Sequence, residues 1–237
     1  MMKQPAPPGI GRLNEAPLHA SLKEYYACEN AQMEAPVDGY IVDVKRGDLL
    51  IEIQTGGFSA IKTKLQRLVE NHPVLLVYPV ALEKWIVKRP KDDAGKETRR
   101  KSPKQGKVVE VFRDLVSFPH LLLDDHFTLE IVLTQEEDIR CYNGKRRWRN
   151  AGWVTEERRL IRVVEQHPIR SPQEFLPYLP SELPQQFSTA DLSNALRISR
   201  RMAQKMSYCL RRMKVFHEVG RKNRSILYEV QTECQDD

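Results

Sequence analysis

The sequence lacks the features that mark several common classes of protein. No apolar run approaches the ~20 residues that a helix needs to span a bilayer. The opening segment, residues 1–12, is rich in proline and contains no apolar signal core. The four cysteines stand far apart with no CxxC pair, so neither a disulfide framework nor a zinc site is indicated. We therefore expect a cytoplasmic protein with reduced thiols and no membrane association.

Several catalytic signatures are also missing. The six histidines show no HxxxH spacing, which argues against a zinc site on a helix face. No GxSxG sequence surrounds a serine, so a serine nucleophile has little support. Gly56-Gly57 is too short to form a phosphate-binding loop and is typical of a turn from a strand into a helix.

Positive charge is what the sequence has in excess. It contains 38 Lys or Arg against 32 Asp or Glu, which gives a net formal charge of +6. Such an excess favours a polyanionic partner but says nothing about the fold. The segment 88–107 holds nine basic and three acidic residues and almost no apolar ones, and this composition predicts a loop or linker.

The first part of the chain alternates helices and strands, as is typical of an α/β fold. Helical spacing of apolar residues begins at Leu18, with Asn14 available as a cap. Two short apolar runs flank Lys45–Asp48, whose composition favours a tight turn and predicts a β-hairpin. We expect a mixed sheet flanked by helices. The predicted helices cover residues 16–26, 59–72, 107–122, 155–167 and 172–179, and the predicted strands cover 40–44, 49–53, 74–80, 83–87 and 127–134.

The last part of the chain predicts a second compact unit. Ser188 and Thr189 can cap a short helix, and the turn at 197–199 leads into a longer helix over 200–213. Two strands follow, joined at Asn223. Helix, turn, helix and β-hairpin is the order of a winged helix-turn-helix, which this α+β unit resembles. The basic residues expected to meet the phosphates of double-stranded DNA are Arg200, Arg201, Lys205, Arg221, Lys222 and Arg224.

These patterns divide the chain into successive segments. The C-terminal unit also has an alternative interpretation, in which it is a protein-docking module with a solvated basic face. The expected segments are a disordered lead-in (1–12), an α/β domain (13–150) with a basic loop (88–107), a helical connector (151–186), the winged-helix unit (187–232) and a tail (233–237).

Acidic residues in the predicted hairpin require an explanation. Burying a carboxylate costs several kcal/mol unless it is paired or binds a cation. Pairing across the turn would place Val42 opposite Ile51 and leave Asp43, Glu52 and Gln54 on the other face. Such an oxygen cluster suits Mg²⁺, which can activate a water against a phosphodiester.

At these positions the sequence resembles the PD-(D/E)xK nuclease superfamily, over residues 13 to about 88. The restriction endonuclease-like core of that superfamily runs helix, three strands, helix, strand, with an Asp at the start of the second strand and Glu-x-Lys in the third. The resemblance assigns Asp38 to the first position, and Glu52 and Gln54 to the other two, with Gln54 in place of the usual lysine. It implies Mg²⁺ or Mn²⁺ as cofactor.

Two further positions complete the family pattern. Glu15, or alternatively Glu24, would fill the acid of the first helix. Glutamine cannot act as an ammonium, so either its amide orients the water or a lysine supplies the positive charge from elsewhere. Lys64 on the following helix is the first candidate and Lys62 the second.

Either of two aspartates could bind the metal, and Asp38 is ranked ahead of Asp43. Strand alternation favours Asp43, whereas the family pattern favours Asp38, which a bulge or bend would restore to the face of Glu52. The competing interpretation has no metal at all. In it Asp43 is a solubility charge on an edge strand, Glu52 is ion-paired and Gln54 starts a loop.

The sequence thus yields three hypotheses about function. The first is a Mg²⁺- or Mn²⁺-dependent nuclease on double-stranded DNA, a homodimer if it cuts both strands. Its aspartate and Glu52 would bind the metal, Gln54 would orient the attacking water, Lys64 would stabilise charge and Glu15 would assist from the outer shell. The second is an inactive nuclease-fold regulator or assembly protein. The third is an RNA-directed nuclease or a docking adaptor. The whole chain also resembles a bacterial family of uncharacterised proteins, which implies no substrate.

Overall fold

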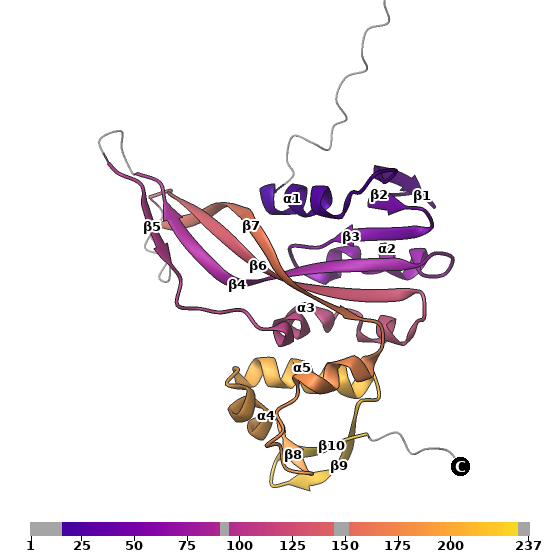
Figure 1. Ribbon diagram of the computed structural model, residues 1–237. Helices are drawn as coiled ribbons and strands as arrows, with labels where there is room; N and C mark the ends of the chain where they lie inside the picture. Colours follow the sequence, from indigo (N-terminus) through magenta and orange to yellow (C-terminus); the bar gives the residue numbers. More distant parts are fainter. Residues whose placement is uncertain (1–15, 91–94, 145–151, 232–237) are drawn as a thin grey trace, which may run out of the picture.

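The computed structural model describes residues 16–90, 95–144 and 152–231. Figure 1 shows a large mixed sheet with helices on both faces and, below it, a smaller unit formed by the end of the chain. The predicted lead-in and tail lie outside the described residues, as do Asn14 and Glu15. No described helix has the length and apolarity needed to cross a bilayer.

The elements follow one another along the chain. The first group is α1 (Pro17–Tyr26), β1 (Gln32–Val37), β2 (Tyr40–Arg46), β3 (Leu49–Ile53), η2 (Phe58–Ile61), α2 (Lys62–Leu68), β4 (Val74–Lys88) and β5 (Thr98–Lys101). The second group is η3 (Val108–Val111), α3 (Phe112–Leu115), η4 (Pro119–Leu123), β6 (Phe127–Tyr142), β7 (Trp153–Ile169) and η5 (Pro172–Tyr178). The last group is β8 (Phe187–Ser188), α4 (Thr189–Leu196), α5 (Arg200–Arg212), β9 (Phe216–Lys222) and β10 (Ser225–Val230).

The large sheet has seven strands, six of them in the order β1-β2-β3-β4-β6-β7, while β5 pairs with the far half of β4. β1, β2 and β3 are antiparallel to one another, whereas β3, β4 and β6 run parallel. β7 returns antiparallel to β6. Parallel strands that are covered on both faces typically have continuous apolar runs in their sequence. The first half of β4, VLLVYPV, and of β6, FTLEIVL, show this pattern.

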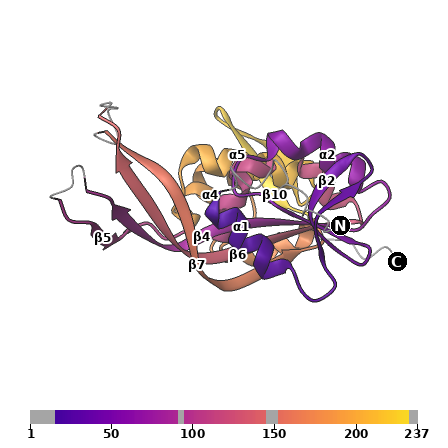
Figure 2. The same cartoon turned by 90° about the horizontal axis from the view of Figure 1, so that it is seen from above.

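Each face of the sheet carries its own apolar layer. α1 covers one face, where Leu18 packs in a cluster with Val44 and Ile51. The opposite face is covered by α2, α3 and the 3₁₀ helices, around the stacked rings of Phe58 and Phe118. Figure 2, viewed from above, looks onto the α1 side. A fully buried side chain of this kind contributes roughly 1.5–3 kcal/mol, so both layers hold the sheet in place.

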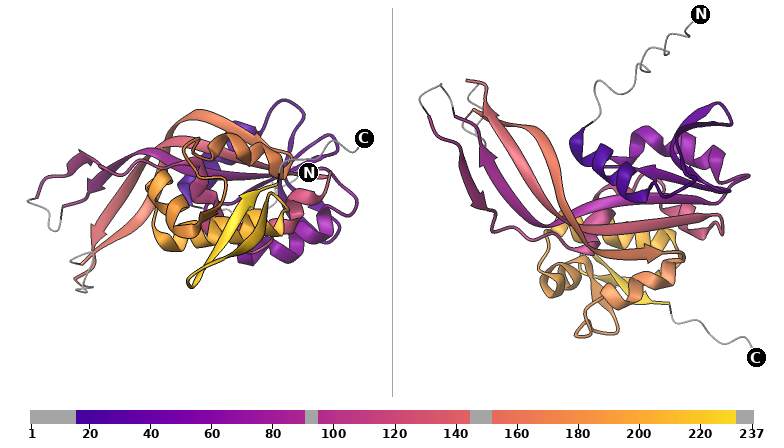
Figure 3. Two further views of the ribbon diagram at one scale, coloured as in Figure 1. Left: turned by 90° about the horizontal axis from the view of Figure 1, so that it is seen from below. Right: turned by 45° about the horizontal axis from the view of Figure 1, so that its top comes forward.

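The far halves of β4, β6 and β7, together with β5, project beyond both helical layers as a twisted arm (Figures 1 and 3). Register shifts at Ala81/Glu83 and along the β6–β7 pair mark β-bulges, which increase strand twist. Arg99 and Lys101 lie 4.9 and 5.5 Å from the ring centroid of Trp85. Cross-strand contacts of this kind stabilise the arm in place of a covering helix.

The C-terminal unit contains the elements that the sequence predicts for it. Asp191 N–H donates to Ser188 Oγ, and Ser188 N–H donates to the Asp191 carboxylate, so α4 begins at a capping box. Met202 N–H donates to Ser199 Oγ at the start of α5. The β9–β10 hairpin follows, and β8 adds a short third strand.

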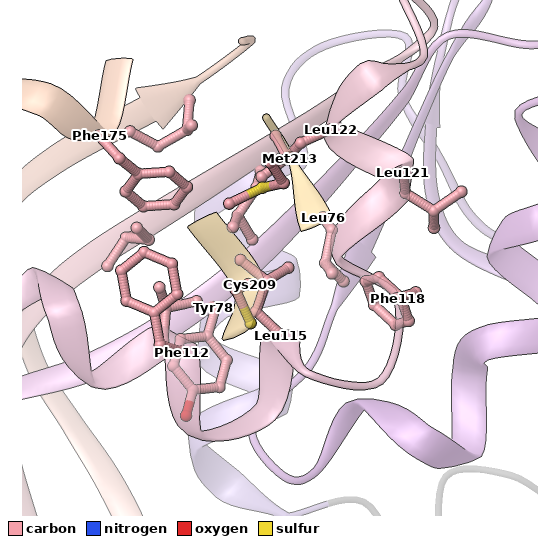
Figure 4. Close-up of a cluster of buried hydrophobic side chains, with 14 of the residues drawn as sticks. Leu76, Tyr78, Phe112, Leu115, Phe118, Leu121, Leu122, Phe175, Cys209 and Met213 are labelled. Carbon is pink, nitrogen blue, oxygen red and sulfur yellow. The ribbon is translucent and has the colours of Figure 1, made fainter. Parts of the chain in front are cut away.

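One hydrophobic core joins the C-terminal unit to the large sheet. Cys209 of α5 and Met213, the residue directly after this helix, belong to the same buried cluster as Phe112, Leu115 and Phe175 (Figure 4). The ring centroids of Phe112 and Phe175 are 4.7 Å apart. The C-terminal unit is therefore packed against the sheet domain through α5.

The expectation of a helical connector is wrong. Residues 155–167, predicted to be helical, form the middle of β7. The bulges on the β6–β7 pair interrupt the strict alternation of buried and exposed side chains, so the apolar spacing along β7 imitates a helix. The predicted boundary at 150 therefore falls inside a strand pair, and the sheet domain continues to Ile169.

Four smaller expectations are also corrected. β1 was not predicted, and the two strands expected at 74–80 and 83–87 are one strand, β4, with a bulge between its halves. The helix expected at 107–122 is three short helical pieces, η3, α3 and η4. The basic segment 88–107 contains β5, because its Arg and Lys side chains can remain in solvent at a sheet edge.

Candidate functional site

β2 is bent at Asp43. The β2–β3 ladder ends at the Val44–Ile51 pair, and from Asp43 back to Tyr40 the strand remains paired only with β1. Val44 packs in the apolar layer under α1, whereas Val42 packs in the layer on the opposite face. Residues two apart in a regular strand share a face, so the backbone must turn between these two valines.

Two carboxylates take the place of the ladder hydrogen bonds beyond this point. Ile53 N–H donates to Asp43 Oδ2 at 2.8 Å, and Asp43 N–H donates to Glu52 Oε1 at 3.3 Å. The Glu52 side chain is 5% exposed and the Asp43 side chain 18% exposed. The two acids therefore lie together, mostly buried, where β2 separates from β3.

Side chains from both helical layers reach the two acids. Lys64, on α2, places its Nζ 2.5 Å from Glu52 Oε1 and donates to the carbonyl of Ile41 at 2.6 Å. That carbonyl belongs to the part of β2 that has left β3, so Lys64 lies between the two strands. His19, on α1, places its Nε2 3.2 Å from Asp43 Oδ2. We call His19, Asp43, Glu52 and Lys64 the β2–β3 site.

The two carboxylates have pKa values shifted in opposite directions. Burial raises the pKa of Glu52; Lys64 opposes this shift and the Asp43 charge adds to it. Burial also acts to raise the pKa of Asp43, but hydrogen bonds from His19 and the Ile53 N–H outweigh it, so that pKa lies below its usual value. Opposed shifts in neighbouring carboxyl groups are typical of functional sites.

The lowered pKa of Asp43 predicts a pH-dependent contribution to stability. The folded chain binds this proton less readily than the unfolded chain, whose value is near 3.8. The contribution is therefore present above pH 3.8 and is lost as the pH falls through the folded-state pKa. Asp43→Asn is expected to lower the free energy of unfolding by about 1–2 kcal/mol at pH 6, and by less at pH 3.

Urea unfolding at the two pH values measures this difference. Asp48→Asn, in the exposed β2–β3 turn, is the matched control and is expected to change stability by less than ~0.5 kcal/mol. An equal loss for Asp43→Asn at both pH values would contradict the lowered pKa.

The β2–β3 site has two carboxylate oxygens that could bind a metal ion. Asp43 Oδ1 and Glu52 Oε2 make no hydrogen bond to any residue that the structure describes. Mg²⁺ is usually held by one or two carboxylates and several waters, so these donors fit Mg²⁺ or Mn²⁺. They do not fit an ion held by protein ligands alone, because no group of three or more His, Cys, Asp or Glu in the described ranges could bind one.

Asp38 is not part of this cluster. It lies in the β1–β2 turn with a left-handed backbone (φ 49°), and its Oδ2 is 2.9 Å from His72 Nε2. It precedes Asp43 by five positions, roughly 16 Å along an extended chain. The bend in β2 therefore does not bring Asp38 beside Glu52, and the geometry favours Asp43 as the aspartate of the pair.

Three other predicted residues lie away from the acid pair. Gln54 Nε2 donates to the Gly57 carbonyl at 2.9 Å. Lys62 lies near His120, whose pKa is lowered by burial and by the charge of Lys62. Glu24 is exposed on α1, and Glu15 is outside the described residues.

The predicted hairpin register is wrong by two residues. Val44, not Val42, faces Ile51, because Arg46 pairs with Leu49 across a turn of two residues instead of four. A shift of two residues leaves every side chain on its original face. The expectation that the two acids share a surface therefore holds despite the wrong register.

His19 is the member of the site that sequence reasoning missed. It carries no paired spacing with another histidine, and only its position beside Leu18 on the buried face of α1 could have indicated that it points toward the sheet. Among the described residues, α1 thus contributes an imidazole to the site.

Basic side chains also follow the exposed face of α5. Arg200 and Arg201 are exposed at its N-terminal end, and Tyr208, farther along the same face, is 43% exposed. Lys205 differs, because it is half-buried and donates to the Arg113 carbonyl. The remaining predicted contacts, exposed at the tip of the β9–β10 hairpin, are Arg221, Lys222 and Arg224.

Comparison with known proteins places the sheet domain in a family. The family model described as Domain of unknown function (DUF8091) matches residues 16–170, and β7 ends at Ile169. The chain belongs to this family. An uncharacterized protein of Treponema pallidum (strain Nichols) is 31% identical over 185 residues, which cover 78% of this chain and 73% of that protein. No solved structure shows significant similarity.

The family region coincides with the corrected sheet domain. It contains all four residues of the β2–β3 site and ends before β8. The C-terminal unit thus lies outside the residues that the family model matches.

Proposed function

We propose that this protein is a metal-dependent nuclease that hydrolyses phosphodiester bonds in DNA. One observation carries the proposal: Asp43 and Glu52 meet, with Lys64 beside them, at the point where β2 separates from β3. Each acid keeps one oxygen for a metal ion, and the ammonium group is close enough to interact with a bound phosphate. Those three groups are what Mg²⁺-assisted attack on a phosphodiester needs.

The order of the elements supports a restriction endonuclease-like core. α1, β1, β2, β3, α2 and β4 run helix, three strands, helix, strand, which is the order of the PD-(D/E)xK core that the sequence resembles. Asp43 lies on the second of these strands and Glu52 on the third. The departure from the pattern is that the aspartate lies within the second strand instead of at its start.

The residues of the site have separate roles in this proposal. Asp43 Oδ1 and Glu52 Oε2 would hold Mg²⁺ or Mn²⁺, which when bound supplies positive charge and a water of lowered pKa. Gln54 occupies the position of the family's usual lysine, and Lys64 takes over the role of that lysine. It stabilises negative charge on the phosphate oxygens. His19 fixes the orientation of the Asp43 carboxylate through the 3.2 Å contact.

The C-terminal unit is proposed to act as a winged helix that holds duplex DNA. The exposed face of α5 and the hairpin tip supply the phosphate contacts, led by Arg200, Arg201 and Arg221. Lys205 is withdrawn from this role by its bond to Arg113. We retain the cytoplasm as the expected compartment, and a homodimer as the form that could cut both strands.

A second candidate function is a DNA-binding protein without catalysis. The observation that favours it is the tight Glu52–Lys64 ion pair, with only 5% of the Glu52 side chain exposed. The engagement of the Gln54 amide by Gly57 points the same way. In this case the acid pair stabilises the point where β2 separates from β3, and α5 carries the DNA-binding function.

Metal-dependent cleavage tests the proposal. Supercoiled plasmid, single-stranded DNA and RNA are each incubated with the full chain in Mg²⁺, in Mn²⁺ and in EDTA. The expected result is nicked or linear plasmid with metal and none in EDTA. Cleavage of RNA alone would replace DNA as the substrate. The absence of cleavage of every substrate in both metals would overturn the hydrolase, and salt-dependent duplex binding lost in Arg200→Ala/Arg201→Ala would then favour the binding protein.

A further inference from the structure

Two clefts join the end of β3 to the start of α5. Each has a volume of about 340 Å³. Both are lined by Lys104, Glu110 and Arg113, so they are adjacent, and we call the two together the inter-unit groove. One end reaches residues 55–57, directly after β3, and the other reaches residues 197–199, directly before α5.

The inter-unit groove starts close to the β2–β3 site. Thr55 follows Glu52 by three residues, so their Cα atoms are at most ~11 Å apart. Gln54, between them, donates to the Gly57 carbonyl at the groove wall. A chain lying in the groove would therefore run toward the acid pair.

The groove carries an excess of positive charge. Its acidic side chains are Glu110, Asp114 and Asp138. Glu110 already accepts bonds from both Lys104 and Arg113, and Asp114 accepts one from Tyr78. The basic side chains that line it are Lys84, Lys104, Lys107, Arg113, Arg197 and Arg158, the last of which is paired with Glu136.

Two of these cations are not held in a direct ion pair with any described residue. Lys84 and Arg197 form no hydrogen bond or ion pair with their side chains in the described part of the chain. Lys107 donates only to the Leu196 carbonyl, which is uncharged. Burial lowers the pKa of Lys84, although the nearby charges of Glu136 and Asp138 act to raise it. A bound anion would add to those charges and compensate further for the solvent that this ammonium has lost.

The floor of the groove also offers an acceptor. Asp138 is 5% exposed, and its Oδ2 accepts two bonds from Arg140, at 3.2 and 2.7 Å. Its Oδ1 has no hydrogen-bond partner among the described residues. A buried oxygen of this kind is costly unless a donor reaches it, and a base or sugar hydroxyl in the groove could supply one.

The wall of the groove is fixed by a close backbone contact. Gly106 N–H donates to the Ala81 carbonyl at 2.9 Å, and a Cβ at this glycine would lie 2.5 Å from that oxygen. The segment carrying Lys104 and Lys107 is therefore held against the bulge of β4. The cations are pre-positioned, which reduces the ordering cost of binding.

We propose that the inter-unit groove binds one strand of nucleic acid. Lys84, Lys107 and Arg197 line the groove without a direct ion pair to a described residue and can contact phosphates, and the cleft volume accommodates a few nucleotides of a single strand but not a duplex. The proposal rests on the proposed function in one respect: the strand so held is the one presented to Asp43 and Glu52. A duplex held by α5 with a single-stranded tail in the groove is then the substrate class.

Binding without cleavage tests this directly. Fluorescence anisotropy in EDTA measures the affinity of a labelled oligothymidylate strand for the full chain, over a range of salt concentrations. Lys84→Met/Arg197→Asn is expected to weaken binding at least tenfold and to lower the slope of log K against log salt by about 1.4, the value for two lost contacts on a single strand. A blunt duplex is expected to bind this variant as it binds wild type.

The matched control is Lys45→Ala/Arg46→Ala. It also removes two positive charges, but at the end of β2 that pairs with the start of β3, away from the groove. This variant is expected to bind the strand as wild type does. Lys107→Ala, an exposed position, provides a second groove variant that does not depend on a half-buried side chain. Equal weakening in the control, or an equal loss of duplex and strand binding in the groove variant, would overturn the groove. Strand binding that persists when no cleavage occurs would leave the groove intact and remove only the nuclease.

Discussion

Glu52→Gln is expected to reduce metal-dependent cleavage by about a thousandfold. The substitution keeps the size of the side chain and removes its negative charge, so the metal loses one of its two carboxylates. Stabilisation of transition-state charge by a bound metal amounts to several kcal/mol, and each 1.4 kcal/mol corresponds to about tenfold in rate. Initial rates on a plasmid in Mg²⁺ measure the loss.

Two controls separate this effect from a general one. Asp38→Asn is expected to retain near wild-type cleavage, because the Asp38 carboxylate contacts His72 in the β1–β2 turn and not the metal pair. Glu70→Gln removes an exposed glutamate just beyond α2 and is likewise expected to be silent. Full cleavage by the Glu52→Gln variant, or its loss in Asp38→Asn, would place the reacting metal elsewhere.

Phe112→Ala is expected to destabilise the chain by about 3–5 kcal/mol, the range for truncating a fully buried phenylalanine. Phe112 is 0% exposed and belongs to the cluster that contains Phe175 and the buried face of α5. For a chain of this length the change corresponds to a fall of roughly 10 °C in Tm. Because one core spans both units, wild type is expected to unfold in a single transition.

Differential scanning calorimetry checks both expectations. Tyr208→Ala, which truncates an exposed aromatic side chain on α5, is the matched control and is expected to change stability by less than ~0.5 kcal/mol. Two separate transitions in wild type, with only one of them shifted by Phe112→Ala, would contradict a shared core.

Local signals predict the parts of the fold that depend on them. α4 and α5 begin at Ser188 and Ser199, whose hydroxyls cap the first turn, so their starts are visible in the sequence. β7 is different, because its bulges alter the alternation along the strand and only pairing with β6 fixes its conformation. That long-range information is absent from a local window of sequence.

The candidate site is likewise predictable only where local sequence signals identify its residues. Acids in apolar strands identify Asp43 and Glu52, and the need for a positive charge identifies Lys64. The bend in β2 depends on competition between two strands and two helical layers, so neither the loss of the ladder nor the role of His19 can be derived from spacing. Asp38 follows from a family pattern alone, and the turn at Asp38-Gly39 places it elsewhere.

β4 links two distant regions of the molecule. Its first residues pair with β3, with Leu76 opposite Glu52, and its last residues pair with β5 in the projecting arm. The outer end of the arm and the strand that borders the acid pair therefore belong to one continuous stretch of backbone. The bulge at Ala81/Glu83 lies between these two regions and interrupts the regular pairing of β4 with β6.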